Sequence, residues 1–385
     1  MSEPVREATD DEHAVTPLEL FFDLVFVFAI TQVTSLLGRD PTWHGLIRGA
    51  LALAAVWWAW TGYAWFTSTL DADEGGVRLA MLAAMATMLG VALALPGAFG
   101  DDAVLFGCSF FVVRLLHLVL YAYAGRNDRD LFTALLRLAP AELIGASLLV
   151  AAGFLAGEGR IAVWIVALLV DYVGPAVVGL HGWRIAPAHF AERYGLIVLI
   201  ALGESIVAIG VGAGFALTAG VVADAVLGVV VVAALWWLYF DVAAIFARRA
   251  LVDASGAAQA RLARDAYSYL HLPMVAGIVF FAFGLETTLH HVGKTLHGLA
   301  ATSLCLGAAL YLIAHVAFLL RTTRHVFRRR TLGACVLLAL TPVTLVIPAL
   351  AALALVAAAC ALVVAYEAIH YREQRVQVRG LEIAR

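Results

Sequence analysis

Acidic and amide side chains interrupt an apolar stretch near the start of the chain that is long enough to cross a lipid bilayer. Leu18 to Leu37 reads LELFFDLVFVFAITQVTSLL and carries Glu19, Asp23 and Gln32. Glu19 and Asp23 are four positions apart, so a helix places them on one face. Charged groups in hydrocarbon are expensive and usually face a bundle interior, a partner or a wet cavity. The stretch therefore predicts a helix that lines a polar pathway or braces a polar interior.

Further ionisable side chains lie inside other apolar stretches, and a plain anchor would not need them. They are Arg114, His117, Glu142, Asp171, Glu204, Asp241, His271 and His315. Arg114 and His117 are three positions apart and therefore share a helix face. An unpaired charge in lipid is costly, so we expect Arg114 to pair with Asp23, Glu142 or Asp171. Because arginine does not release its proton, a structural role suits Arg114 best.

Glu204 is the candidate for reversible proton binding. It precedes Ser205 near the middle of an apolar stretch, where burial favours the neutral acid. His271 stands two positions before Pro273, and proline removes a helix hydrogen bond, so this histidine could gate a pathway. Asp171 is likewise followed by a Gly-Pro pair. Discontinuous helices beside acids are typical of ion and substrate sites at the bilayer midplane.

The composition indicates an integral membrane protein. The 385 residues are 63% hydrophobic and only 14% charged, and the mean hydropathy is +0.93. Since a helix needs about 20 apolar residues to cross a bilayer, the chain has room for about twelve spans. They are Leu18–Leu37, His44–Phe66, Arg78–Phe99, Ala103–Ala124, Leu131–Ala156, Ile161–Gly182, Phe190–Gly214, Val221–Ala247, Ala266–Leu289, Leu299–Leu320, Thr331–Ile347 and Ala349–Tyr371. The fold class predicted is an all-α polytopic membrane helical bundle, and the last two spans form either a hairpin or one broken helix at Pro348.

The basic residues predict the orientation of the spans. Most of the 25 Lys and Arg residues fall in loops on the same side as the N-terminus. The positive-inside rule then places both termini in the cytoplasm. The basic run from Arg321 to Arg330 is explained by this topology and by anionic headgroups, so we expect no nucleic-acid partner. The lone lysine, Lys294, lies in an outside loop, which excludes a retinal Schiff base.

A weak internal repeat divides the apolar part into two halves. Each half has an acidic residue, a double tryptophan in the following span and a histidine in the fourth span. The landmarks are Asp23, Trp57-Trp58 and His117, then Glu204, Trp236-Trp237 and His315. We expect two parallel six-helix repeats, residues 18–182 and 183–371, between an acidic cytoplasmic tail, residues 1–17, and a cytoplasmic tail, residues 372–385.

Three segments resemble the bacterial low temperature requirement A (LtrA) family. They are Glu19-Leu-Phe-Phe-Asp23 continuing to Gln32, His189-Phe-Ala-Glu192-Arg193-Tyr194-Gly195 running into Leu202-Gly203-Glu204-Ser205, and Tyr269-Leu-His271-Leu-Pro273. The resemblance implies a multi-pass protein of the bacterial cytoplasmic membrane, and it supplies no biochemical activity. A fainter resemblance, at Phe22-Asp23, is to the two-repeat, six-span potassium channels of endosomes and lysosomes. This chain lacks the serine of their motif, and its second half has Glu204 in place of aspartate.

The leading hypothesis is a proton- or cation-coupled transporter with Asp23 and Glu204 as the titrating pair at the repeat interface. The other pathway candidates are Asp171, Glu142, His271, His117 and Arg114, and the candidates for gating or lining are Phe22, Gln32, Ser205, Pro273 and His315. The alternatives are a cation channel built from the same repeats, and a sensor or structural protein whose buried charges are all paired. We expect no enzyme, cofactor or metal site. The expected partners are membrane lipids and a small ion or molecule, and a homo-oligomer stays open.

Overall fold

The computed structural model describes residues 15–69, 75–214 and 217–370. These residues are helical without a strand, apart from one isolated bridge between Thr295 and Pro348. The chain forms two compact units. The described part of unit 1 lies within Met1–Leu36, His44–Arg193 and Ser255–Arg261, and that of unit 2 within Leu37–Trp43, Tyr194–Ala254 and Leu262–Arg385. The predicted tails, residues 1–17 and 372–385, lie almost wholly outside the described residues.

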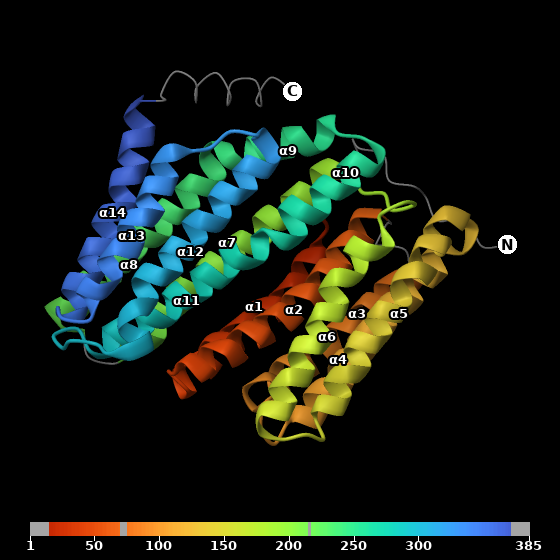
Figure 1. Ribbon diagram of the computed structural model, residues 1–385, viewed down its shortest axis with the longest axis horizontal. Coiled ribbons are helices and arrows are strands. Elements are labelled where there is room, and N and C mark those ends of the chain that lie inside the picture. Colours follow the sequence, from red (N-terminus) through yellow and green to blue (C-terminus); the bar gives the residue numbers. More distant parts are fainter. Residues whose placement is uncertain (1–14, 70–74, 215–216, 371–385) are drawn as a thin grey trace. The chain divides into compact units, whose positions relative to one another are not determined.

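Unit 1 is built from the helices of the first half of the chain and the start of α7 (Figure 1). Helices α3, α4, α5 and α6 pack in chain order, each against the next. Because lipid offers no hydrogen bonds, such apolar segments satisfy their backbone groups within the helix. The bounds are α1 Pro17–Arg39, α2 Trp43–Thr69, α3 Gly75–Ala94, α4 Ala103–Ala124, α5 Arg129–Ala152 and α6 Gly157–Val178, with short 3₁₀ turns η1 Leu95–Gly97 and η2 Gly125–Asn127.

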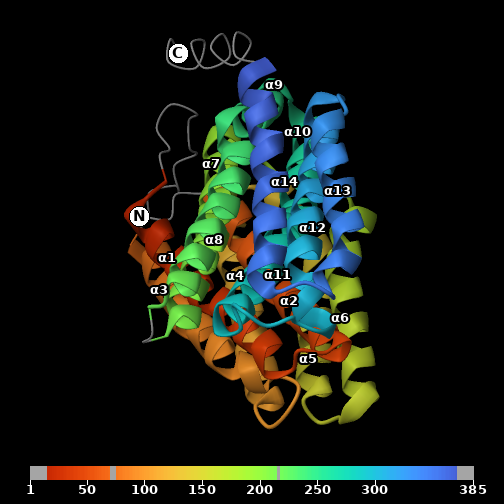
Figure 2. The same ribbon diagram turned by 90° about the vertical axis from the view of Figure 1, so that its left-hand side faces the viewer.

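Unit 2 contains the rest of α7 and the helices that follow, apart from α10 (Gly256–Leu262), whose residues up to Arg261 belong to unit 1. Figure 2 shows α14 running beside α8, and these two helices pack together, as do α11 with α12 and α12 with α13. The bounds are α7 Pro187–Ala213, α8 Ala219–Leu238, η3 Tyr239–Ala243, α9 Ala244–Asp253, α10 Gly256–Leu262, η4 Ala263–Tyr269, α11 His271–His290, α12 Gly298–Thr323, α13 Arg328–Thr344 and α14 Ala349–His370. The segments η3 and η4 are π-helical turns inside longer helical runs.

Glycines bring α11 and α12 into backbone contact. A Cβ atom built on Gly277 would lie 2.7 Å from the carbonyl oxygen of Gly307, and one on Gly307 would lie 2.7 Å from that of Gly277. Small residues that let helix backbones approach closely are typical of membrane helix interfaces. The two glycines therefore hold the best-buried pair of helices in unit 2 together.

The described helices confirm a multi-pass, all-helical membrane protein. Ten helical segments are long and apolar enough to span a bilayer. They are Pro17–Arg39, Gly75–Gly97, Ala103–Asn127, Arg129–Ala152, Gly157–Val178, Pro187–Ala213, Ala219–Asp253, Gly256–His290, Gly298–Thr323 and Ala349–His370. Helices α2 and α13 are not among the ten. Helices α13 and α14 are separate and pack against each other, so the chain forms a hairpin at Pro348.

Candidate functional site

A buried ion-pair network joins the first turns of α1 and α7. We call it the Arg193 cluster, and its members are Glu19, Asp23, Trp60, Thr67, His189 and Arg193. The guanidinium of Arg193 donates to Glu19 Oε1 at 2.6 Å and to Asp23 Oδ1 at 2.7 Å. Its Nη1 also donates to Thr67 Oγ1 at 2.8 Å. Arg193 is 0% exposed, so its whole side chain is removed from solvent and lipid.

The two carboxylates of this cluster have different second partners. His189 Nε2 lies 3.1 Å from Glu19 Oε2, whereas Trp60 Nε1 donates to Asp23 Oδ1 at 2.9 Å. His189 and Arg193 are four positions apart on α7, as Glu19 and Asp23 are on α1. Matching spacing on the two helices lets two side chains of one face meet two of the other.

A second buried network lies between α4, α5 and α6. This Arg114 cluster comprises Arg114, His117, Glu142 and Asp171, all buried. Arg114 Nε lies 3.2 Å from Glu142 Oε1, and Arg114 Nη2 donates to Asp171 Oδ1 at 3.4 Å. His117 Nδ1 lies 2.7 Å from the same Glu142 oxygen. The prediction that Arg114 pairs with Asp23, Glu142 or Asp171 is thus correct for the last two acids, while Asp23 is bound by Arg193 instead.

Two glycines make room for the Arg114 cluster. A Cβ atom on Gly62 of α2 would lie 3.0 Å from His117 Nε2 and 3.3 Å from Arg114 Nη1. A Cβ atom on Gly145 of α5 would lie 2.8 Å from Asp171 Cγ. A Cβ atom at Gly145 would force Asp171 to shift, and one at Gly62 would fit only if the His117 imidazole gave way slightly, so the backbone itself forms part of the wall of the cluster.

The two clusters share one composition and one pattern of contacts. Each contains an arginine, a histidine and two carboxylates, and in each the glutamate touches both the arginine and the histidine while the aspartate touches the arginine. With histidine neutral and both acids ionised, each cluster carries one more negative than positive charge. Because a net charge in a dry interior is costly, each cluster is neutral when it holds one extra proton.

Helix α2 lies between the clusters. Trp60 and Thr67 bond to members of the Arg193 cluster, while the Trp58 carbonyl accepts from Arg114 at 3.4 Å. Tyr63 bridges the two sides, since its ring centroid lies 4.8 Å from that of Phe22 and 5.4 Å from that of His117. Trp60 is only two positions from Trp58, and Thr67 lies about 10 Å farther along, near the end of α2. The Arg193 cluster thus extends from the level of the Trp58 carbonyl to the end of α2.

Unit 2 holds an aromatic and histidine cluster around His271. His271 Nε2 lies 2.8 Å from the Tyr239 hydroxyl, its Nδ1 lies 3.1 Å from the Ala266 carbonyl, and its ring stacks on Tyr267 at 5.3 Å. Both π-helical turns supply these neighbours, and such turns are frequent at functional sites. The expected helix disturbance before Pro273 is present, because η4 ends at Tyr269 and α11 starts at His271.

A buried arginine also lies beside His315. Arg330 donates from Nε and Nη2 to the two oxygens of Glu367, at 2.9 and 2.8 Å, and from Nη1 to the Leu238 carbonyl at 3.0 Å. The same Nη1 lies 3.2 Å from His315 Nε2. A guanidinium faces this imidazole, so the ring is neutral here. The pair of Arg330 and Glu367 balances its own charge and needs no extra proton.

Four further predicted residues, Glu204, Ser205, Phe22 and Gln32, are outside the two charge clusters as defined above. Glu204 and Ser205 are buried on the part of α7 that belongs to unit 2, whereas Asp23 belongs to unit 1. The proposed pairing of Asp23 with Glu204 therefore stays a prediction. Phe22 is buried against Tyr63, and Gln32 is partly buried on α1. Within the described ranges, no three His, Cys, Asp or Glu side chains are grouped as a metal site.

Sequence reasoning named Glu19 in the first polar span but did not select several charged partners of these networks as candidates. They are His189 and Arg193 in unit 1, and Arg330 and Glu367 in unit 2. One available signal was the pair of acids four positions apart in the first span, which requires a buried cation. Arg193 was one of few cations near an apolar stretch and could have been assigned to that pair.

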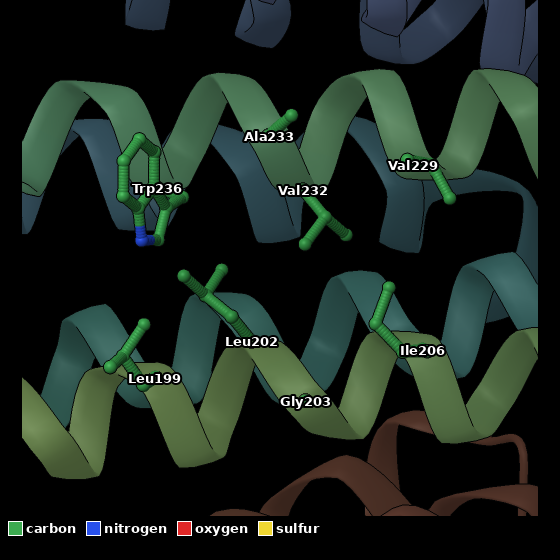
Figure 3. A pocket seen from close by; sticks show the side chains of 8 residues that line it. All are labelled: Leu199, Leu202, Gly203, Ile206, Val229, Val232, Ala233 and Trp236. Carbon is green, nitrogen blue, oxygen red and sulfur yellow. The ribbon is translucent and has the colours of Figure 1, made fainter.

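An apolar hollow lies between α7 and α8 in unit 2 and contains none of these polar groups. Its volume is about 370 Å³, and Figure 3 shows Leu199 and Leu202 of α7 facing Trp236 and Val232 of α8 across it. Gly203 deepens it, since a Cβ atom there would meet nothing within 4 Å.

Comparison with known proteins identifies a family and a relative. Residues 14–365 match the family described as bacterial low temperature requirement A protein (LtrA). An uncharacterized protein of Rhizobium meliloti (strain 1021) is 33% identical over 298 residues, which cover 74% of this chain and 72% of that protein. No solved structure matches.

Proposed function

The chain belongs to the bacterial low temperature requirement A (LtrA) family, and from its buried charge clusters we propose that it is a proton- or cation-coupled transporter. It would carry a small ion or molecule and would not be an enzyme. The observation that carries this proposal is the shared charge imbalance of the Arg193 and Arg114 clusters. Each is neutral only with one extra proton, which a coupled transporter could bind and release.

The contacts suggest which groups hold that proton. Arginine keeps its charge, so Arg114 and Arg193 act as fixed counter-ions. In the Arg114 cluster the proton lies on His117 or on a carboxyl, and Asp171 is held more loosely than Glu142, at 3.4 Å from the guanidinium. Protonation of Asp171 frees Arg114 to bind Glu142 alone. A change of partner of this kind provides two arrangements, which alternating access requires.

Phe22, Tyr63 and His117 would form the coupling path between the clusters. Their rings follow one another at 4.8 and 5.4 Å. Glu204, His271 and Ser205 would belong to the corresponding path in unit 2, with Asp23 and Glu204 meeting at the repeat interface. Pro273 and His315 would take part in gating.

We further propose a twelve-span topology with two six-helix repeats in the cytoplasmic membrane and both termini in the cytoplasm. Helices α2 and α13 would be the two additional spans. The 27 residues of α2 exceed the length a span needs, and the 17 residues of α13 reach its lower end. The distribution of Lys and Arg supports this orientation. Membrane lipids would be the immediate partners.

A structural or sensory protein is the second candidate, and the short contacts of Arg193 favour it. Distances of 2.6 and 2.7 Å to two acids describe a tightly held brace. Buried networks of this kind can fix helix register without moving a proton. A cation channel would use the same helices as the proposed transporter, and it would differ from the transporter in the rate at which ions cross.

Proton flux in proteoliposomes with an entrapped pH dye separates these candidates. Asp171→Asn and Asp23→Asn each leave one positive and one negative charge, so both variants should stay folded and lose proton coupling. Glu204→Gln tests the expected partner in unit 2. Asp101→Asn is the matched control, because this aspartate is exposed in the loop before α4.

The outcomes distinguish the candidate functions. Loss of proton flux in the buried variants alone supports transport, and the unitary rate then distinguishes a channel from a carrier. Wild type that moves no proton or cation, with all variants folded, would favour the structural candidate.

A further inference from the structure

Asp224 of α8 is a buried aspartate that has no role in the proposed transport mechanism or in the structural alternative. It is 0% exposed, and neither carboxylate oxygen has a hydrogen-bond partner among the described residues. The four buried acids of the Arg193 and Arg114 clusters each contact an arginine. Asp224 differs from these four acids in this respect, so its charge state needs an explanation.

The glycines one helical turn away show where Asp224 faces. Gly220 and Gly228 lie four positions before and after it, on the same face of α8. A Cβ atom on Gly220 would lie 3.0 Å from Val292, and one on Gly228 would lie 2.8 Å from Leu285. Asp224 thus faces the end of α11 between these two residues.

The ionisable groups around this position are few. Between Leu285 and Val292 lie half-buried Glu286 and exposed His290 of α11 and exposed His291 just after it, and Asp224 hydrogen-bonds to none of them. Helix α7 passes at Ile209, 3.4 Å from the Cβ position of Gly228, and its last residues, 210–213, carry no ionisable side chain.

Helix α14 closes the remaining side of this position without a charge. Val292 touches the start of α8 at Gly220, and its carbonyl accepts a hydrogen bond from Leu350 at the start of α14. The two helices therefore begin at one level and run together. The first two turns of α14, Ala349 to Val356, contain alanine, leucine and valine only. No cation or polar side chain from α14 can compensate a carboxylate at this depth.

We propose that Asp224 is held as a neutral carboxylic acid and is a proton-binding site of unit 2. An ionised carboxylate without a partner costs far more to bury than the neutral acid, so a lone acid in this position keeps its proton. The site lies in the second turn of α8. Any role of this proton in transport rests on the proposed function, whereas its presence does not.

Infrared difference spectroscopy of the purified, full-length protein tests the proposal. The spectrum of wild type minus Asp224→Asn at neutral pH should show loss of the carbonyl band of a protonated carboxylic acid. Asp101→Asn, the matched control at an exposed aspartate, should remove only the bands of an ionised carboxylate. If Asp224→Asn also removes only carboxylate bands, Asp224 is ionised and the proposal is wrong. Should that variant fail to fold, Asp224→Ser provides the same comparison.

Labelling with a hydrophobic carbodiimide gives a second readout. The neutral acid adds across a C=N bond of the reagent with its proton, so the adduct keeps every atom of both molecules. Mass spectrometry should find the adduct on Asp224 in wild type, and raising the pH should reduce the yield. Absence of the adduct in protein that lacks the infrared band overturns the proposal. Proton flux through the Asp224→Asn variant in liposomes tests the proposed transport function. It does not test whether Asp224 holds a proton, which the infrared band and the adduct decide.

Discussion

His189 and His117 hold equivalent places in the two buried clusters of unit 1. Each imidazole touches a glutamate that an arginine also binds, at 3.1 Å in the first case and 2.7 Å in the second. Each glutamate therefore lies between a guanidinium and an imidazole. A neutral imidazole with its N–H toward the glutamate donates a hydrogen bond, and a protonated one keeps that bond and adds a positive charge beside the glutamate.

Two substitutions of His117 separate its hydrogen bond from its charge. His117→Gln keeps a donor toward Glu142 but cannot gain a proton, so we expect a folded protein without proton coupling. His117→Leu removes the bond as well and should cost about 1.5–3 kcal/mol of unfolding free energy, the range for a hydrogen bond to a charged group. Thermal unfolding and liposome flux measure the two effects. Full flux in His117→Gln would contradict a proton-carrying role.

Loss of Arg193 should be the most damaging single change in unit 1. Arg193→Gln leaves Glu19 and Asp23 buried without a cation, and breaking a buried pair in this way costs about 3–5 kcal/mol. The same substitution at exposed Arg137, which donates to the Thr133 carbonyl, should stay within about 0.5 kcal/mol. Melting temperatures in one detergent compare the two. Equal melting temperatures would mean that the cluster contributes no stability.

The all-helical membrane fold could be predicted from the sequence because about 20 successive apolar residues have few alternatives to a spanning helix. The partners of Arg114 could be narrowed for a similar reason, since few cations lie inside spans. Glu142 and Asp171 were both among the expected acids. The choice between candidates depends on helix rotation and depth, which periodicity does not determine.

Arg330 was missed because hydropathy places helix ends poorly. The span predicted from Thr331 begins at Arg328 in the structure, so a shift of three residues moves Arg330 from a loop into a helix, where its side chain reaches Glu367. Arg193 already lay near the start of the span predicted from Phe190, but its position at a helix end left open whether its side chain faces water or a buried acid. Long basic side chains near helix ends can point either way, so sequence alone does not decide between a surface charge and a buried one.

A methyl group at Gly62 should disturb the Arg114 cluster. Gly62→Ala places a carbon 3.0 Å from His117 Nε2, so the imidazole must move away from α2. Overpacking of this kind typically costs about 1–3 kcal/mol. Gly203→Ala is the matched control, because its Cβ atom enters open space and alanine favours helix. Unfolding measurements should show loss of stability at Gly62 alone, and the reverse order would contradict the close packing described.

The ion pair of Arg330 and Glu367 gives a contrast that tests charge imbalance as the proposed functional feature. Arg330 is buried and Glu367 is partly buried, and the charges of this pair balance. Replacement of a buried ion pair by apolar residues of similar volume is often neutral or stabilising, whereas loss of one partner costs about 3–5 kcal/mol. We therefore expect Arg330→Met with Glu367→Leu to melt close to wild type, and Arg330→Met alone to melt well below it.

Transport by the same double variant decides whether the pair is only a brace. If the labile protons belong to the two clusters of unit 1, removing a balanced pair from unit 2 should leave proton flux in liposomes near the wild-type rate. Asp171→Asn, which balances the charge of the Arg114 cluster, should lose coupling at similar stability. Loss of flux in the double variant, in protein with an unchanged melting temperature, would show that Arg330 and Glu367 themselves take part in proton movement and that charge imbalance is not the distinguishing property.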